Sequence, residues 1–403
     1  MPRVDPCVLA LNGGSSSIKF ALFEARDPRK RILAGEIARI GLPDATLRVT
    51  GAAPADNISR AVAASDHAAA ADVAVEWIKL RAGDGLIGVG HRFVHGGPTY
   101  SAPETITPDL IADLRRLSPF DPEHLPLEIR LSEAVSRQFP DLPQVACFDT
   151  AFHHELPRVA RILPIPRRFE AQGVRRYGFH GLSYAFLMGE LTRLVGTKAA
   201  RGRVVLAHLG NGASLAAVLD GKSVDTSMSF TPTAGVPMGT RSGDLDPGLF
   251  GYLARTEGFD AARFTRMVNF ESGLLGISET SSDMRDLLDR ETDDVRSAEA
   301  IALFCYQVKK WIGGFAAALG GLDTLVFSGG VGSNAPVIRG RICDGLGFLG
   351  LTIDEQRNAA NEGVISSAVS PVTVRVIPTD EERMISEMVS VVLGPDKKRR
   401  INL

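Results

Sequence analysis

Val8-Leu-Ala-Leu-Asn-Gly-Gly-Ser-Ser-Ser-Ile-Lys-Phe-Ala-Leu22 and Val205-Leu-Ala-His-Leu-Gly-Asn-Gly-Ala-Ser-Leu-Ala-Ala-Val-Leu219 follow the same plan. At one constant offset, the residues that recur are Val8, Leu9, Ala10, Gly13, Ser17 and Leu22, which return as Val205, Leu206, Ala207, Gly210, Ser214 and Leu219. Each stretch is typical of a β-hairpin, because an apolar strand, a Gly/Ser or Gly/Asn turn and a second strand follow one another. We infer two related domains; a chance likeness between two ordinary hairpins is the alternative.

The segments around the two hairpins alternate between helical and strand patterns. Helices are predicted at 67–81, 124–137, 297–319 and 381–393, and strands at 86–89, 144–149, 324–328 and 372–377. Such a mixture predicts an α/β protein. A domain boundary is expected near residues 150–160.

Length, charge and cysteine content limit the partners and the location that we expect for this protein. The chain has 403 residues, enough for about two or three domains, and 45 Lys plus Arg against 47 Asp plus Glu give a formal charge of -2. This balance predicts neither a nucleic-acid nor a membrane partner. Its 4 cysteines form no Cys-x-x-Cys pair and no signal peptide or membrane span is evident, so we expect a cytoplasmic location.

Three loops rich in glycine, serine or asparagine are candidate phosphate-binding sites. They are Asn12–Lys19, His208–Gly212 and Ser328–Asn334, and the last two directly follow apolar strands. Backbone N–H groups in such loops can approach an anion closely. None matches the P-loop pattern, and any one alone is more often a plain turn. Together they favour a nucleotide with several phosphates.

Four charged residues indicate the chemistry, and two of them, Arg92 and Asp149, lie at the ends of predicted strands. Arg92 and Arg241 suit bidentate recognition of carboxylate or phosphate, whereas Asp149 and Glu381 suit magnesium binding or polarisation of a nucleophile. The long polar segment 225–247 is typical of a functional loop. With no Ser-His nucleophile pattern and no dinucleotide fingerprint, phosphoryl transfer is the leading reaction class.

Seven motifs in this order resemble the acetate kinase family, within the acetokinase group, from Val8 to about Met388. The motifs are Asn12-x-Gly-Ser-Ser-Ser-x-Lys19, His91-Arg-x-Val-His-Gly-Gly97, Phe148-Asp-Thr-Ala-Phe-His153, Arg175-Arg-Tyr-Gly-x-His-Gly181, His208-Leu-Gly-Asn-Gly212, Met238-Gly-Thr-Arg-Ser-Gly-Asp-x-Asp-Pro247 and Thr379-Asp-Glu-Glu382. The resemblance implies the actin, sugar-kinase and heat-shock-ATPase fold, with duplicated domains and an ATP cleft between them. It also implies an N-terminal domain of residues 1–155 plus 385–403, a nucleotide-binding and dimerisation domain of residues 156–384, and a homodimer.

The resemblance further implies a role for each matching residue. Arg92 and Arg241 would hold the acetate carboxylate and the moving phosphoryl group, His180 would stabilise that group, and Asp149 would orient or activate the carboxylate. The remaining roles are a methyl pocket of Val94, Phe120, Phe179 and Pro232; a magnesium site, with manganese as an alternative, of Asn12 and Glu381; phosphate contacts from Lys19, His208, Leu209, Gly210, Asn211 and Gly212; and nucleoside contacts from Asp283, Met284, Arg285, Gly330, Val331, Gly332, Ser333 and Asn334.

Three departures from the family pattern bear on substrate choice. The chain reads Ser118-Pro-Phe-Asp-Pro122 where the family commonly has Ala-Pro-Leu-His-Asn-Pro, so the histidine is missing and Phe120 replaces a pocket leucine. Phe93 replaces a small β-branched residue, and Ser333 replaces a glutamate. The expected enzyme is therefore a magnesium-dependent acetate kinase that exchanges phosphoryl between ATP and acetate, giving ADP and acetyl phosphate. The alternatives are a propionate or other short-chain acyl kinase, and an actin-like nucleotide switch.

Overall fold

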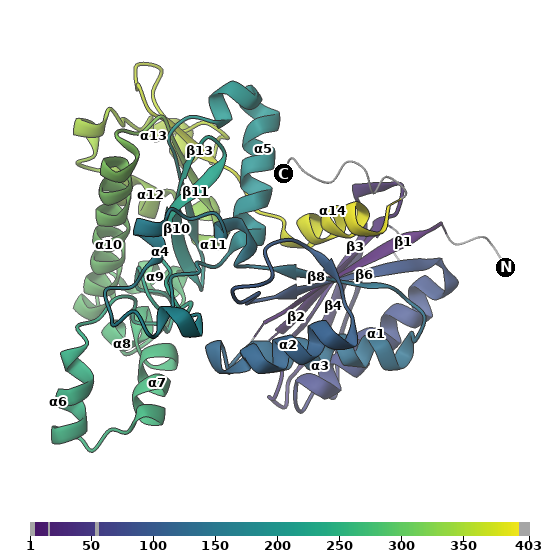
Figure 1. Ribbon diagram of the computed structural model, residues 1–403. Coiled ribbons are helices and arrows are strands. Elements are labelled where there is room, and N and C mark those ends of the chain that lie inside the picture. The colour runs from purple at the N-terminus through teal and green to yellow at the C-terminus, as the bar shows by residue number, and fades with distance from the viewer. Residues whose placement is uncertain (1–4, 15–16, 53–55, 395–403) are drawn as a thin grey trace. The chain divides into compact units, whose positions relative to one another are not determined.

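The chain folds into two compact units, each built on its own β-sheet (Figure 1). The computed structural model describes residues 5–14, 17–52 and 56–394. The first unit runs to Ala151 and resumes at Asp380, and the second unit is Phe152–Thr379. The domain limits expected at 155/156 and 384/385 stay a prediction, and residues 395–403, like Ser15 and Ser16 of the first candidate loop, lie outside the described part.

An eight-stranded mixed sheet forms the first unit, in the order β5-β4-β3-β2-β1-β6-β8-β7. Its strands are β1 (Cys7–Gly13), β2 (Ser17–Glu24), β3 (Asp27–Ala38), β4 (Thr46–Gly51), β5 (Ile58–Ala61), β6 (Leu86–Phe93), β7 (Glu104–Thr105) and β8 (Gln144–Phe148). β1 and β2 pair antiparallel, whereas β1, β6 and β8 run parallel. The parallel strands therefore end at the same edge of the sheet, where Arg92 and Asp149 lie.

Helices cover both faces of this sheet (Figure 1). They are α1 (His67–Ala82), α2 (Pro108–Leu117), α3 (Leu125–Gln138) and α14 (Glu381–Leu393). Leu9 and Leu11 join the core under α1 and α3, while α14 packs on the other face of β1 and β6. Gly90 makes that approach possible, since a Cβ there would lie 2.3 Å from the Ile385 side chain.

A five-stranded sheet, in the order β11-β10-β9-β12-β13, forms the second unit. The strands are β9 (Val204–Leu209), β10 (Ala213–Leu219), β11 (Lys222–Thr226), β12 (Thr324–Ser328) and β13 (Thr373–Val376). The helices are α4 (Arg158–Arg161), α5 (Gly181–Ala200), α6 (Gly248–Thr256), α7 (Ala261–Phe270), α8 (Gly273–Ser278), α9 (Met284–Arg290), α10 (Val295–Leu319), α11 (Gly329–Asn334), α12 (Pro336–Cys343) and α13 (Glu355–Ala359). Within this unit, α10 and α5 lie on opposite sides of the sheet (Figure 1).

The two sheets share one topology, which confirms the duplication inferred from the hairpins. β3-β2-β1-β6-β8 of the first unit corresponds to β11-β10-β9-β12-β13 of the second. In each, a strand pairs antiparallel with the next strand of its hairpin and parallel with a later strand. The glycine turns after β1 and β9 therefore occupy equivalent positions, at the end where α/β proteins bind ligands.

Most of the expected elements are confirmed. Both hairpins form, the closing helix spans Glu381–Leu393 as predicted, and the segment from Ser227 to Pro247 has neither helix nor strand. One expectation is wrong: Ser328–Asn334 is not a loop, because Gly329–Asn334 form the short helix α11. Within the described residues, no helix combines the length and apolar character needed to cross a bilayer.

Candidate active site

The residues expected to act together divide between the two units. The first unit holds Asn12, Lys19, Arg92, Val94, Phe120, Asp149 and Glu381; the second holds Phe179, His180, His208–Gly212, Pro232, Arg241, Asp283–Arg285 and Gly330–Asn334.

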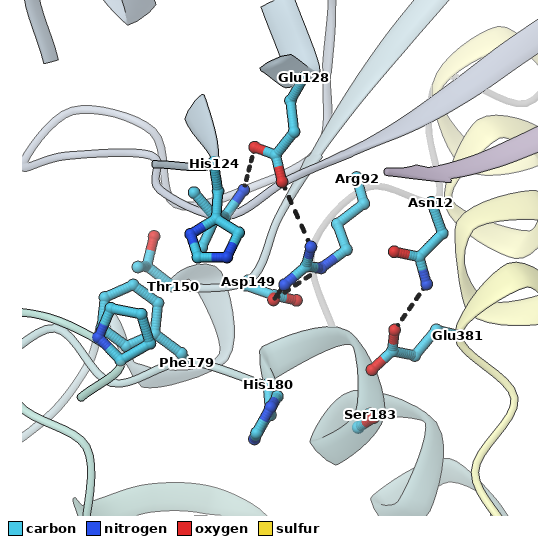
Figure 2. Close-up of polar contacts among 12 residues, drawn as sticks. Asn12, Arg92, His124, Glu128, Asp149, Thr150, Phe179, His180, Ser183 and Glu381 are labelled. Atoms are coloured by element: carbon cyan, nitrogen blue, oxygen red, sulfur yellow. Dashed lines mark hydrogen bonds and ion pairs between the residues drawn. The ribbon is translucent and has the colours of Figure 1, made fainter. Parts of the chain in front are cut away.

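Arg92 is the centre of a buried ion cluster in the first unit (Figure 2). It lies on β6 beside β8, so its guanidinium reaches Asp149 directly after β8. Nε donates to Asp149 Oδ2 at 2.9 Å and Nη2 contacts the same oxygen at 2.6 Å. Nη1 donates to Glu128 Oε1 on α3 at 3.2 Å and to the carbonyl of Gly13 at 3.2 Å. One largely buried cation, 14% exposed, therefore meets two fully buried carboxylates.

Burial and charge set the protonation of this cluster. Burial raises the pKa of Glu128 from 4.5 to about 8, against the opposing effects of Arg92 and of the Val94 N–H, which donates to Glu128 Oε2 at 2.8 Å. Burial alone lowers the pKa of Arg92, but the charges of Asp149 and Glu128 outweigh it and raise that pKa. Arg92 is therefore always charged, and Glu128 carries a proton more readily than a surface glutamate.

Glu128 makes the stability of the protein depend on pH. Its pKa is about 8 in the folded chain and 4.5 ordinarily, so between these values the folded chain holds a proton that the unfolded chain releases. Its contribution is fully present below 4.5 and lost as the pH rises through about 8. We expect the free energy of unfolding to fall across this window by up to about 1.4 kcal/mol per pH unit.

Denaturant unfolding of the parent and of Glu128→Gln at a series of pH values checks this expectation. The substitution should remove the slope. Glu133→Gln, on the same helix but paired with Arg115 at the surface, should keep it. Equal slopes in the parent and in Glu128→Gln would contradict the assignment.

Hydrogen bonds and a ring contact hold the first-unit residues that are expected to form the wall of the acceptor pocket. Val94 is 2% exposed and is fixed through its N–H by Glu128. Phe120 stacks edge-on against His95 with ring centroids 5.4 Å apart. Asp121 accepts from the backbone N–H of His124 at 3.0 Å and contacts its ring at 2.9 Å. The segment after Ser118–Pro122 therefore has a histidine three residues after Asp121, paired with that carboxylate.

Asn12 and α14 meet at a group of oxygen atoms suited to a hard cation (Figure 2). Asn12 Nδ2 donates to Glu381 Oε2 at 2.8 Å and to Glu382 Oε1 at 3.2 Å. Burial, then the neighbouring charge of Glu381, raises the pKa of Glu382. The amide nitrogen of Asn12 faces the carboxylates. The Asn12 oxygen and the Glu381 carboxylate are of the type that magnesium prefers, which is oxygen ligands with few protein carboxylates. Lys19 faces Asn12 across the hairpin.

The described residues contain no group of three His, Cys, Asp or Glu side chains that could hold a metal by themselves. Magnesium usually takes one or two protein carboxylates together with substrate phosphates and water. The donor set at Asn12 and Glu381 suits a magnesium ion of that kind, delivered with a nucleotide.

His180 is held in a defined orientation in the second unit. It lies directly before α5 in a left-handed conformation, with φ of 59°, which is uncommon for a residue other than glycine. Its Nδ1 contacts Ser214 Oγ at 2.8 Å, and Tyr184 shares that hydroxyl at 2.5 Å. The His208 ring lies 4.4 Å away, centroid to centroid. The contact of Nδ1 with Ser214 therefore fixes the orientation of the His180 ring.

Gly212 lies between His180 and Arg241. A Cβ at this position would be 3.3 Å from His180 Nε2 and 3.8 Å from Arg241 Nη1. Arg241 is anchored by its own Nη1, which donates to the carbonyl of Pro232 at 3.3 Å. Two nitrogen donors thus converge on a glycine turn at the end of β9, an arrangement that binds a group of concentrated negative charge.

Replacing Gly212 with alanine is expected to reduce the rate of phosphoryl transfer roughly tenfold, because the new methyl group pushes His180 by a few tenths of an ångström. Steady-state kinetics of acyl phosphate formation measure the effect. The control is Gly189→Ala on α5, where a Cβ meets nothing within 4 Å. A Gly212→Ala enzyme as fast as this control would show that the close approach is unimportant.

The remaining candidate nucleotide residues are joined to this turn. The N–H of Gly239 donates to the Asn211 carbonyl at 3.0 Å, and a Cβ on Gly239 would lie 3.2 Å from the carbonyl of Ser282, which precedes Asp283. Asp283 caps the start of α9, accepting from the backbone N–H of Arg285, and pairs with the Arg285 side chain. Gly329 approaches Leu209 so closely that a Cβ would lie 2.5 Å from its carbonyl oxygen. The structure thus brings 208–212, 238–241, 282–285 and α11 together.

Sequence reasoning missed Glu128, although the sequence contains a signal for it. Leu125, Glu128, Ile129, Ser132 and Val135 are buried on one face of α3. Their spacing is that of an apolar helix face. A glutamate on such a face needs a buried partner, and Arg92 supplies it. Ser214 was missed for a different reason, since only the folded β9–β10 hairpin brings it to His180, where Tyr184 of α5 shares its hydroxyl.

Comparisons with known proteins agree with this arrangement. A family model described as the Acetokinase family matches residues 7–387. The acetate kinase of Rhodopseudomonas palustris is 44% identical over 388 residues, covering 95% of this chain and 97% of that protein. The acetate kinase of Deinococcus radiodurans is 43% identical over 392 residues, covering 96% and 98%.

Two solved structures are similar over nearly their whole length. The Porphyromonas gingivalis acetate kinase has a TM-score of 0.87 at 37% identity, covering 96% of this chain and 100% of that one. A propionate kinase from Francisella tularensis has a TM-score of 0.88 at 34% identity, covering 95% and 98%.

Proposed function

The chain belongs to the acetokinase family, and we propose that it catalyses the reversible transfer of a phosphoryl group between ATP and acetate, giving ADP and acetyl phosphate. It is an ATP:acetate phosphotransferase, a kinase whose acceptor is a carboxyl group. The observation that carries the proposal is the convergence of His180 and Arg241 on Gly212, because a transferring phosphoryl group needs fixed positive donors around its oxygens.

Arg92 orients the acceptor. An Nη2 N–H of its buried guanidinium remains for a carboxylate after Asp149, Gly13 and Glu128 have taken their hydrogen bonds. Asp149 keeps the guanidinium in place and balances its charge. Val94 and Phe120 would contact the methyl group from the first unit, and the family resemblance assigns the same role to Phe179 and Pro232.

The transfer needs no general base. Acetate is already ionised near neutral pH, so one carboxylate oxygen attacks the γ-phosphorus in line while the bond from that phosphorus to the ADP oxygen breaks. No proton moves, and the negative charge develops on the phosphoryl oxygens, where His180 Nε2 and Arg241 donate hydrogen bonds. Asp149 therefore acts through Arg92 rather than by removing a proton.

Asn12 and Glu381 would hold the magnesium ion that accompanies the nucleotide, with Lys19 near the phosphates. The ion supplies charge neutralisation on the phosphate oxygens. We expect chelation with EDTA to abolish acyl phosphate formation, and added magnesium or manganese to restore it. Turnover that persists at full rate in EDTA would contradict the metal requirement.

The second unit would bind the rest of the nucleotide. Residues 208–212 would contact the phosphates, and Asp283–Arg285 with Gly330–Asn334 would contact the nucleoside. Ser333 is 9% exposed, and its carbonyl together with that of Gly332 accepts from the buried Arg339. This internal cap fixes the end of α11, which supports a rigid wall there.

A propionate or other short-chain acyl kinase is the second candidate, favoured by Phe120 in the acceptor wall. One methylene changes discrimination by only about 1–3 kcal/mol. Trapping the product with hydroxylamine, for acetate, propionate and butyrate with MgATP, ranks the acids by catalytic efficiency. The highest value for acetate supports the proposal, and the highest value for propionate moves the assignment to the second candidate.

We also propose a cytoplasmic location and a homodimer. The four cysteines are free and buried, which supports a reducing compartment. The homodimer rests on the family alone, and analytical ultracentrifugation tests it: a single species with the mass of one chain would contradict it.

A further inference from the structure

The hydrogen bonds that Arg92 makes within the protein leave few N–H donors for a substrate. A guanidinium has five N–H donors. Nε–H and one Nη2–H point to Asp149, and the two Nη1–H groups point to the Gly13 carbonyl and to Glu128. Among the described residues, a single Nη2 donor remains. A carboxylate that binds Nη1 and Nη2 together, in the bidentate geometry that arginine favours, must displace Gly13 or Glu128 from Nη1.

Of these two partners of Nη1, Glu128 resembles the substrate, because both offer a carboxylate to the arginine. Its side chain is 2% exposed and reaches Arg92 through Oε1 and the Val94 N–H through Oε2. It therefore joins the residue expected to bind the acid to the residue expected to contact its methyl group. The charged groups that face Glu128 are Arg92 on β6, Asp149 after β8 and Asp121 before α3. Two of these three are carboxylates.

We propose that Glu128 is a positioning residue for Arg92 and an internal competitor of the substrate carboxylate, so that it sets the affinity of the site for the acid. The proposal rests on the proposed carboxylate kinase function and adds a residue to it. Ionised Glu128 holds Nη1 and repels an entering carboxylate. When Glu128 is neutral, its hold on Nη1 weakens and the repulsion is lost. The KM for the acid then depends on Glu128, whereas the KM for MgATP does not.

Glu128→Gln tests this role, because glutamine keeps the shape of the side chain and removes its charge. Acyl phosphate formation is measured with acetate and MgATP varied in turn, one unit above the glutamate pKa of about 8, where the parent is ionised. We expect the KM for acetate to fall roughly tenfold. The KM for MgATP and kcat should stay within about twofold. Glu133→Gln, on the same helix, should match the parent in all three values.

A second measurement needs no substitution. In the parent, the KM for acetate should rise between one unit below and one unit above a pH of about 8, and the KM for MgATP should not. This comparison keeps the proposal testable even if Glu128→Gln does not fold. A purely structural glutamate would instead change the KM values of both substrates together, or change kcat alone.

The possible outcomes distinguish a failure of the role of Glu128 from a failure of the proposed kinase function. An active parent whose KM for acetate is the same in Glu128→Gln, or whose two KM values shift equally, overturns the role of Glu128 and leaves the function standing. A parent that makes no acyl phosphate from acetate, propionate or butyrate overturns the function, and this role with it. A selective fall in the KM for the acid supports both.

Discussion

Arg241→Ala is expected to lower kcat for acyl phosphate formation by a factor of about 10³. Arg241 Nη1 and His180 Nε2 both lie close to Gly212, and the Pro232 carbonyl accepts a hydrogen bond from Arg241. Truncation removes a charge that stabilises the transition state more than the bound substrates, so kcat should fall far more than KM rises. Steady-state kinetics in both directions measure the loss.

Two variants serve as controls for Arg241. Arg266→Ala removes an exposed arginine of the same unit, paired only with Glu271 among its described contacts, and should leave the rate unchanged. Arg241→Lys keeps the charge but not the fork of donors, so it should recover only part of the rate. An Arg241→Ala enzyme within tenfold of the parent would show that this arginine does not face the moving phosphoryl group.

Arg92→Ala is expected to impair both stability and catalysis. It leaves Asp149 and Glu128, at 0% and 2% exposure, without their shared cation. Breaking such a buried pair from one side costs about 3–5 kcal/mol. The acid also loses its binding donor, so the KM for acetate should rise well beyond the concentrations that saturate the parent.

Tryptophan fluorescence isolates the effect of Arg92 on stability. Trp77 on α1 reports on the first unit, where it packs against Phe20, and Trp311 in the second unit can be changed to phenylalanine in every variant. Guanidinium unfolding then gives the change in the free energy of unfolding that Arg92→Ala causes. The control is Arg48→Ala, at an exposed position on β4. A loss below about 1 kcal/mol, the value of a surface ion pair, would contradict a buried cluster.

Local sequence patterns were enough to predict the two hairpins, the closing helix and the duplication of the sheet. Apolar strands bracketing glycine turns predicted both hairpins, and the repeat between them predicted the common topology of the two sheets. The amphipathic pattern of α14 gave its bounds correctly. Arg92 and Asp149 were both placed at strand ends, where the parallel pairing of β6 and β8 indeed brings them together.

The errors and omissions come from tertiary contacts. Three glycines within 329–332 indicate a loop, because glycine disfavours helix, yet Arg339 caps the carbonyls of Gly332 and Ser333 and the helix α11 forms. The contact of Asn12 with Glu382 joins distant parts of the chain. Glu128 belongs to none of the seven motifs, and its importance follows from the face of α3 on which it lies.

Phosphoryl transfer from ATP to acetate is tested most directly by measuring both of its products, ADP and acetyl phosphate, in the same reaction. Purified protein with MgATP and acetate is followed by phosphorus NMR, which resolves ADP, acetyl phosphate and inorganic phosphate. We expect ADP and acetyl phosphate to appear one to one, only when acid is present, and the reaction to reverse when ADP and acetyl phosphate are supplied. ADP and inorganic phosphate released at the same rate without any acid would contradict it and indicate a nucleotide switch instead.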